Sequence, residues 1–207
     1  PVESANMMAQ AMVKAHYAGL KVISHCEDLE IIDGGIINKG KISQQLGVKG
    51  MSRLSEDTIT ARELAIAQDT QMPIHIAHVS TKGSVNTIRG NTHIGVMCTC
   101  ETAPHYFMMT DEKLLSRDAD YRMNPPLREE DDVMAITAAV ADGTIDCIVT
   151  DHAPHSAEEK AKGLAGSLMG VVGLETAFGV LNTKLVKTGI ITIEKLIDMM
   201  SVKPREI

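Results

Sequence analysis

The chain has 207 residues, of which 44% are hydrophobic and 23% are charged, and its formal net charge at pH 7 is −7. This composition suffices for one globular core and excludes the basic surface that nucleic-acid binding requires. No apolar stretch approaches the about 18 residues of a membrane span, and no signal-peptide pattern occurs. We therefore expect a cytoplasmic protein with a small-molecule substrate and neither a nucleic-acid nor a membrane partner.

The first half of the chain alternates predicted helices and strands. A helix is expected from Ser4 to Tyr17, and an apolar strand over residues 21–26 follows it,. Five glycines in the stretch 33–54 predict a long loop with at most short elements,. A helix over 55–70 and a strand over 74–79, opened by a proline, come next.

The second half repeats this alternation. Its predicted elements, in chain order, are a helix at 81–89, a strand at 93–100, a helix at 131–142, a strand at 145–150, and helices at 172–187 and 192–201,. The stretch between the strand at 93–100 and the helix at 131–142 contains Pro104, Pro125 and Pro126, and it predicts a loop,. The segment 156–163, rich in charged residues, reads as a solvated and mobile segment that could cover a site,.

Strands that alternate with helices predict an α/β fold with a parallel sheet and right-handed crossovers. Only four strong strands occur, whereas a complete (β/α)₈ barrel needs about 250 residues. We therefore interpret residues 1–207 as the second half of a TIM-type metal-dependent hydrolase barrel. This half would comprise the last four strands with their helices, and the N-terminal half would lie outside this chain. An open doubly-wound domain is the alternative, but no G-x-G-x-x-G turn follows any strand,.

Three predicted strands end in side chains that can bind a metal. These side chains are His25, His78 and Asp151. Parallel strands of a barrel carry their reactive groups at their C-terminal ends. Two imidazoles and a carboxylate suit zinc, which activates water when a coordination position is open. Asp151 could also move a proton during catalysis.

Other polar or reactive residues receive more ordinary interpretations. His75 lies three residues before His78, on the opposite face of its strand, so we expect it to be a hydrogen-bonded packing residue,. Asn124 precedes two prolines and either presents its amide to a substrate or forms part of a turn,. The four cysteines show no CxxC spacing and are read as buried free thiols,.

Five segments together resemble a known family. They are HCED at 25–28, HIAHVSTKGS at 75–84, CETAPHY at 100–106, MNPPLR at 123–128 and TDHAPH at 150–155. In order and spacing they resemble the type I dihydroorotases of the amidohydrolase superfamily along the whole chain. The resemblance implies a zinc-dependent cyclic amidase that interconverts dihydroorotate and N-carbamoyl-L-aspartate in pyrimidine biosynthesis, with two zinc ions in a complete site.

The resemblance also implies roles for individual residues. His25 and His78 would bind one zinc ion, and Asp151 would bind the other and carry the proton. The substrate would be held by Asn124, by His155 and by the backbone of Met169 and Gly170. The loop that ends in Ser167-Leu168-Met169-Gly170 departs from the family's usual Ala-Pro-Phe-Gly-like sequence.

The family's H-x-H-x-R strand and its bridging acid would lie upstream of Pro1, so we expect the 207 residues alone to be inactive. A hydantoinase, dihydropyrimidinase or allantoinase type of cyclic amidase is an alternative with the same machinery. A third hypothesis is a non-catalytic, dihydroorotase-like scaffold for aspartate transcarbamoylase. As protein partners we consider a second copy of the chain or aspartate transcarbamoylase.

Overall fold

The computed structural model describes all residues, 1–207, and its centre is a parallel sheet. The strands, in their order across the sheet, are β1 (Val22–Ser24), β4 (Ile74–Ile76), β5 (Cys98–Thr102) and β6 (Cys147–Ile148). Every neighbouring pair is parallel, as the alternation of strands and helices predicted,. The chain therefore folds as a partial (β/α)₈ barrel.

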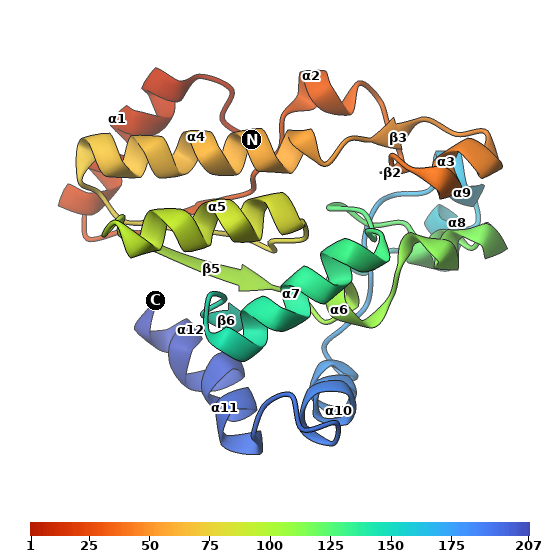
Figure 1. The fold of residues 1–207 in the computed structure, drawn as a ribbon. Coiled ribbons are helices and arrows are strands. Elements are labelled where there is room, and N and C mark those ends of the chain that lie inside the picture. Colours follow the sequence, from red (N-terminus) through yellow and green to blue (C-terminus); the bar gives the residue numbers. More distant parts are fainter.

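The longest helices cover one face of this sheet (Figure 1). They are α1 (Ala5–Tyr17), α4 (Leu54–Thr70), α5 (Lys82–His93) and α7 (Glu130–Asp142). Each packs beside the next one in this series, and their apolar side chains join those of the sheet in a core of 27 buried residues. Burial of this apolar surface is the main force that holds the layers together.

The two faces of the sheet differ because side chains alternate along a strand. Ile74, Ile76 and Cys100 point toward the helices and are at most 1% exposed. The side chains between them point away from the helices, and on the outer strand β1 this leaves Ile23 65% exposed. In a closed barrel this second face would line the interior.

Most predicted helices form near their predicted bounds. The hydroxyl of Ser4 caps α1 by accepting a hydrogen bond from the Met7 amide at 3.2 Å,. The predicted strand over 93–100 is partly wrong, because α5 continues to His93 and β5 begins only at Cys98. Gly95, with a φ of 89°, turns the chain between them, so Ile94 and Met97 lie exposed rather than in the sheet.

Short elements follow the strand ends. They are α2 (Leu29–Ile32), the parallel pair β2 (Ile37–Asn38) and β3 (Gly50–Met51), α3 (Lys41–Leu46), α6 (His105–Met108), the 3₁₀ turns η1 (Asp111–Ser116) and η2 (Ala119–Tyr121), α8 (Ala157–Lys160) and α9 (Gly163–Gly166). The stretch 33–54 thus holds only short elements, as predicted.

The C-terminal helical region contains two π-helical segments. It comprises α10 (Ala177–Leu181), η3 (Asn182–Val186), α11 (Ile193–Ile197), η4 (Asp198–Val202) and α12 (Lys203–Glu206). Leu181, Leu185, Leu196 and Met199 from this region join the main core. None of the helices in the structure has the length and apolarity to cross a membrane.

Candidate active site

The chain leaves the sheet abruptly at two of the predicted strand ends. His78 has a φ of 35° and Asp151 a φ of 49°, both in the left-handed region that few residues other than glycine adopt,. This backbone conformation turns the chain at the C-terminal edge of the sheet. Strained conformations of this kind are concentrated at functional sites.

The structure brings His25 and His78 together. His25 Nδ1 lies 2.7 Å from His78 Nε2, although the two residues are 53 positions apart in the sequence. Burial is the larger cause that lowers the pKa of His78, and the nearby His25 lowers it further. Both rings therefore meet as the sequence predicted, and His78 is held in the neutral form that binds metals.

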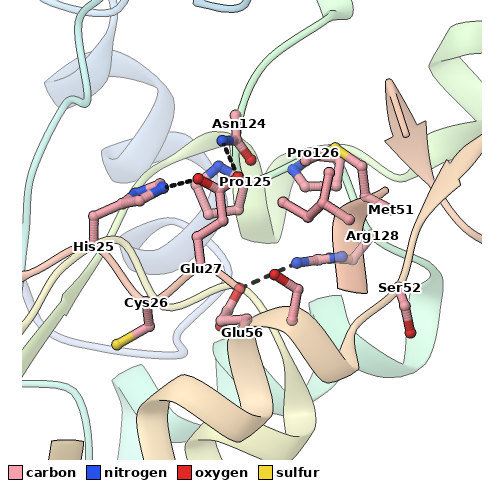
Figure 2. A pocket seen from close by; sticks show the side chains of 12 residues that line it. His25, Cys26, Glu27, Met51, Ser52, Glu56, Asn124, Pro125, Pro126 and Arg128 are labelled. Carbon is pink, nitrogen blue, oxygen red and sulfur yellow. Dashed lines mark hydrogen bonds and ion pairs between the residues drawn. The ribbon is translucent and has the colours of Figure 1, made fainter. Parts of the chain in front are cut away.

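Glu27 links this pair of histidines to the proline-rich loop (Figure 2). Its carboxylate accepts hydrogen bonds from His25 Nε2 at 2.9 Å and from Asn124 Nδ2 at 2.7 Å. Burial favours the protonated form of Glu27, but these two donors hold its pKa below the usual value. Asn124 thus lies beside Glu27, which in turn contacts the candidate metal ligand His25.

Asp151 lies next to the two histidines and to a third one. Its Oδ2 is 3.8 Å from Nε2 of His105, and its charge acts on His78. Burial raises the pKa of the Asp151 carboxyl, a shift that His78 opposes and Glu101 reinforces. His105 is 5% exposed at its side chain, and burial lowers its pKa to about 3, so this imidazole is neutral.

Several groups at this site fit a metal ion. His25 donates through Nε2 to Glu27, so its Nδ1 lone pair points toward His78, in the carboxylate–histidine arrangement that orients metal-ligating imidazoles,. The buried Nε2 of His105 has no hydrogen-bond partner. His25 and His78 thus meet at the strand ends, and both act electrostatically on Asp151. These three side chains are the ones that would hold a metal ion there.

The other predicted substrate residues form a separate contact group. His155 Nε2 lies 2.9 Å from the carbonyl oxygen of Met169, and the Gly170 amide donates to the Arg122 carbonyl at 3.0 Å. The strand-like bridge between His152 and Val171 holds both segments together. The structure thus brings His155, Met169 and Gly170 together.

Gly170 has no room for a side chain. A Cβ atom there would lie 2.3 Å from the carbonyl oxygen of Ala153 and 2.9 Å from His155 Nε2. We expect Gly170→Ala to displace this backbone, to lower the free energy of unfolding by about 1–3 kcal/mol and to raise KM for the substrate. Chemical denaturation and steady-state kinetics measure both effects. Gly179→Ala is the matched control, since no atom lies within 4 Å of the place where its Cβ would stand; equal effects in both variants would contradict this prediction.

Lys160 holds the loop that carries Met169 and Gly170. Its ammonium donates to four backbone carbonyls, those of Ala119, Arg122, Leu168 and Gly170, at 2.7–3.2 Å. The interpretation of 156–163 as solvated and mobile is therefore wrong for this residue, because a long lysine can satisfy its charge on backbone oxygens. An ammonium carries only three protons, so these four carbonyls share them.

We expect Lys160→Met to release this loop. Hydrogen bonds from a charged donor contribute about 1.5–3 kcal/mol, so amide hydrogen exchange over residues 163–170 should accelerate at least tenfold, which corresponds to a loss of about 1.4 kcal/mol of local stability. Lys162→Met, which alters an exposed lysine with no hydrogen bond, should leave exchange unchanged. Equal protection in Lys160→Met and the unaltered protein would show that the clamp is not needed.

Three residues of the site were not assigned a role from the sequence. Glu27, Glu101 and His105 all lie inside the recognised motifs, but no spacing rule distinguishes them from packing residues. Their roles depend on contacts with residues distant in the sequence, such as that of Glu27 with Asn124 and that of His105 with Asp151. For Glu27 the available signal was its position two residues after the strand-end ligand His25.

The parallel sheet with its covering helices defines part of a (β/α)₈ barrel. An L-hydantoinase (dihydropyrimidinase) from Arthrobacter aurescens has the same fold, with a TM-score of 0.87 at 21% identity over 100% of this chain and 47% of its own. A D-hydantoinase from a Thermus species gives a TM-score of 0.83 at 23% identity over 98% and 46% of the two chains. These similarities confirm the predicted barrel fold.

Sequence relatives narrow this class. A family model described as dihydro-orotase-like matches residues 1–84. Dihydroorotases from Trichlorobacter lovleyi and Geobacter metallireducens are 49% and 47% identical over all 207 residues, which are 48% and 49% of their own lengths. That of Bacillus caldolyticus is 41% identical over 205 residues, 48% of its length. The chain is thus homologous to dihydroorotases throughout, and it spans about half the length of these relatives.

Proposed function

We propose that the protein carrying these residues is a zinc-dependent cyclic amidase that interconverts dihydroorotate and N-carbamoyl-L-aspartate. The observation that supports this most strongly is the meeting of His25 and His78 at the ends of β1 and β4, with Asp151 beside them. The named function of the sequence relatives supplies the substrate. We further propose that the chain forms the last four strands of the barrel and that other strands complete the site.

In this proposal His25 and His78 hold one zinc ion and Asp151 holds the second. Zinc bound there would supply Lewis-acid activation of water and of the amide carbonyl. The Asp151 carboxylate takes a proton from the attacking water as the new C–O bond forms. It returns that proton to the ring nitrogen as the C–N bond breaks, and the second proton of the water leaves when the new carboxyl group ionises.

The remaining residues of the proposal hold the substrate. Asn124 presents an amide that Glu27 fixes in place. His155 and the backbone of Met169 and Gly170 contact the substrate, and Lys160 holds their loop in place. Because these groups come from different loops, they fix orientation as well as affinity, and orientation contributes directly to rate.

The test uses the complete polypeptide that carries this chain. Elemental analysis should find zinc, and the protein should hydrolyse dihydroorotate. His78→Ala should lose both zinc and activity, whereas His93→Ala, which alters an exposed histidine at the end of α5, should keep both. A protein without zinc and without activity would contradict the proposal and favour the non-catalytic scaffold for aspartate transcarbamoylase.

The fold similarity to hydantoinases makes a second substrate class worth the same assay. Hydantoin, dihydrouracil and allantoin should be turned over far more slowly than dihydroorotate, and the reverse order would reassign the substrate.

We also propose a cytoplasmic location and, as protein partners, a second copy of the chain or aspartate transcarbamoylase. Analytical ultracentrifugation, with and without the transcarbamoylase, tests these partners.

A further inference from the structure

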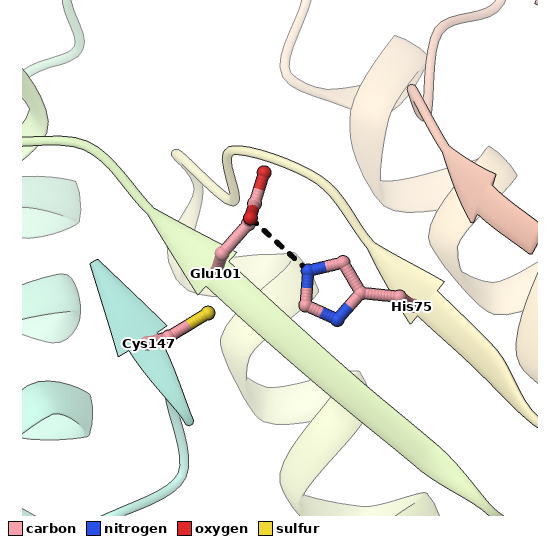
Figure 3. A group of neighbouring side chains, drawn as sticks. All are labelled: His75, Glu101 and Cys147. Atoms are coloured by element: carbon pink, nitrogen blue, oxygen red, sulfur yellow. Dashed lines mark ion pairs between the residues drawn. The ribbon is translucent and has the colours of Figure 1, made fainter. Parts of the chain in front are cut away.

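A second cluster of metal-binding side chains lies within the sheet itself (Figure 3). It consists of His75 on β4, Glu101 on β5 and Cys147 on β6. One nitrogen, oxygen or sulfur atom from each lies within 4.8 Å of those of the other two. None of the three is a predicted ligand of the site formed by His25, His78 and Asp151.

The strand register explains how these residues meet. His75 is aligned with Thr99, and Glu101 is aligned with Cys147. Thr99 and Glu101 are two positions apart on β5 and point to the same face. All three side chains of the cluster therefore project from neighbouring strands into the face opposite the helices, the one that would line a barrel interior.

The environment of the cluster resembles that of a built metal site. His75 is 2% exposed, its Nε2 lies 3.2 Å from Glu101, and its other ring nitrogen lies 2.8 Å from the Thr99 hydroxyl. A ligating histidine ordinarily has such a hydrogen-bond partner on its second nitrogen, which orients the ring. Thr99 can thus orient His75 while Nε2 stays directed toward Glu101.

Cys147 differs from the other three cysteines. The thiols of Cys26, Cys98 and Cys100 each lie within 3.8 Å of a backbone carbonyl that accepts from them, whereas Cys147, 1% exposed, makes no hydrogen bond. Burial, with Glu101 and Asp146 nearby, raises its thiol pKa to about 12. The thiol is thus protonated in the metal-free protein, and a bound soft cation would displace that proton, since coordinating thiols are deprotonated outright.

We propose that His75, Glu101 and Cys147 form a second metal site for a soft divalent cation such as zinc. Imidazole, carboxylate and thiolate are zinc's usual protein ligands, and three of them leave a fourth position for water. Tetrahedral zinc at about 2.0–2.3 Å from each donor would space the donors by about 3.3–3.7 Å, which side-chain rotations from the present spacing can reach. An ion there would join three adjacent strands. This proposal does not depend on the proposed function.

Cobalt(II) is the probe, because thiolate bound to cobalt gives a near-ultraviolet charge-transfer band that nitrogen and oxygen ligands alone do not. The complete polypeptide, stripped of metal and titrated with cobalt, should show this band. Cys147→Ser should abolish it and lower cobalt uptake by one ion per chain. Cys98→Ser, a matched control on the neighbouring strand β5, should leave it intact.

The outcomes separate this site from the one at the strand ends, which contains no thiolate ligand. Absence of the band in the cobalt-loaded parent, or its persistence in Cys147→Ser, would overturn the proposal whatever the amidase activity is. If Cys147→Ser does not fold, Glu101→Gln decides, since it keeps the shape of the side chain. In Glu101→Gln, the cobalt complex that gives the band should form with at least tenfold weaker affinity. An unchanged affinity would also overturn the proposal.

Discussion

Asp151→Asn should reduce dihydroorotate hydrolysis by about 10²–10⁴-fold, the usual contribution of general acid–base catalysis. An amide has nearly the shape of a carboxylate but cannot take the proton from water or return it to the leaving nitrogen. The prediction rests on the position of Asp151, which lies in the left-handed turn after β6 and close to both His78 and His105. Steady-state kinetics in the complete polypeptide measure the loss as a change in kcat.

Asp69→Asn is the control for this variant, because it alters an exposed carboxylate on α4 that makes no hydrogen bond. It should leave kcat unchanged. Thermal unfolding of both variants separates a lost proton transfer from a damaged fold, since only the former leaves the melting temperature in place. A kcat for Asp151→Asn within threefold of the parent value would exclude Asp151 as the proton carrier.

Arg128→Met should destabilise the protein by about 3–5 kcal/mol, because it leaves a buried carboxylate without its counter-charge. Arg128 donates to Glu56 at 3.2 Å, to Ser80 at 3.0 Å and to Asn38 at 3.2 Å, and both charged side chains are 4% exposed. Glu56 and Arg128 also line the pocket shown in Figure 2. Urea denaturation measures the loss of unfolding free energy. Arg205→Met is the control, since it alters an exposed position and should change this free energy little.

The same ion pair predicts a dependence of stability on pH. Burial would favour protonated Glu56, but Arg128 and the hydrogen bonds from Ser80 lower its pKa below the ordinary 4.5. A carboxyl with a lowered folded pKa stabilises the fold fully above its unfolded value, and this contribution is lost as pH falls through the folded one. The free energy of unfolding should therefore decrease as the pH drops below about 4.5, and it should decrease less steeply in Glu56→Gln. Equal slopes in both proteins would contradict the assignment.

The sequence predicted the parallel sheet and its main helices because their signals are local. The helical spacing and the Ser4 cap defined α1, and apolar runs between helices defined the strands. The start of β5 was missed because Ile94, Val96 and Met97 are as apolar as a strand, whereas only Val96 is buried. Which apolar residues enter the core depends on the tertiary fold, since Gly95 diverts the chain there.

The candidate site was predictable where its residues follow strands. The meeting of His25 and His78 follows from the topology, since their strands are neighbours in the sheet. The contacts of Lys160 and the cluster around Cys147 were not predictable. Four carbonyl acceptors from separate loops leave no trace in the residues near Lys160. A histidine, an acid and a cysteine on three strands have meaning only once the register is known.

The outer strands of the sheet limit how it can be extended. β1 and β6 each pair on one side only, and both run parallel to their neighbours. A tight hairpin could add only an antiparallel strand, because a parallel neighbour requires a crossover of a dozen or more residues. A segment of the same polypeptide that continues the parallel sheet at either border is therefore expected to be connected through strand–helix units of right-handed crossover.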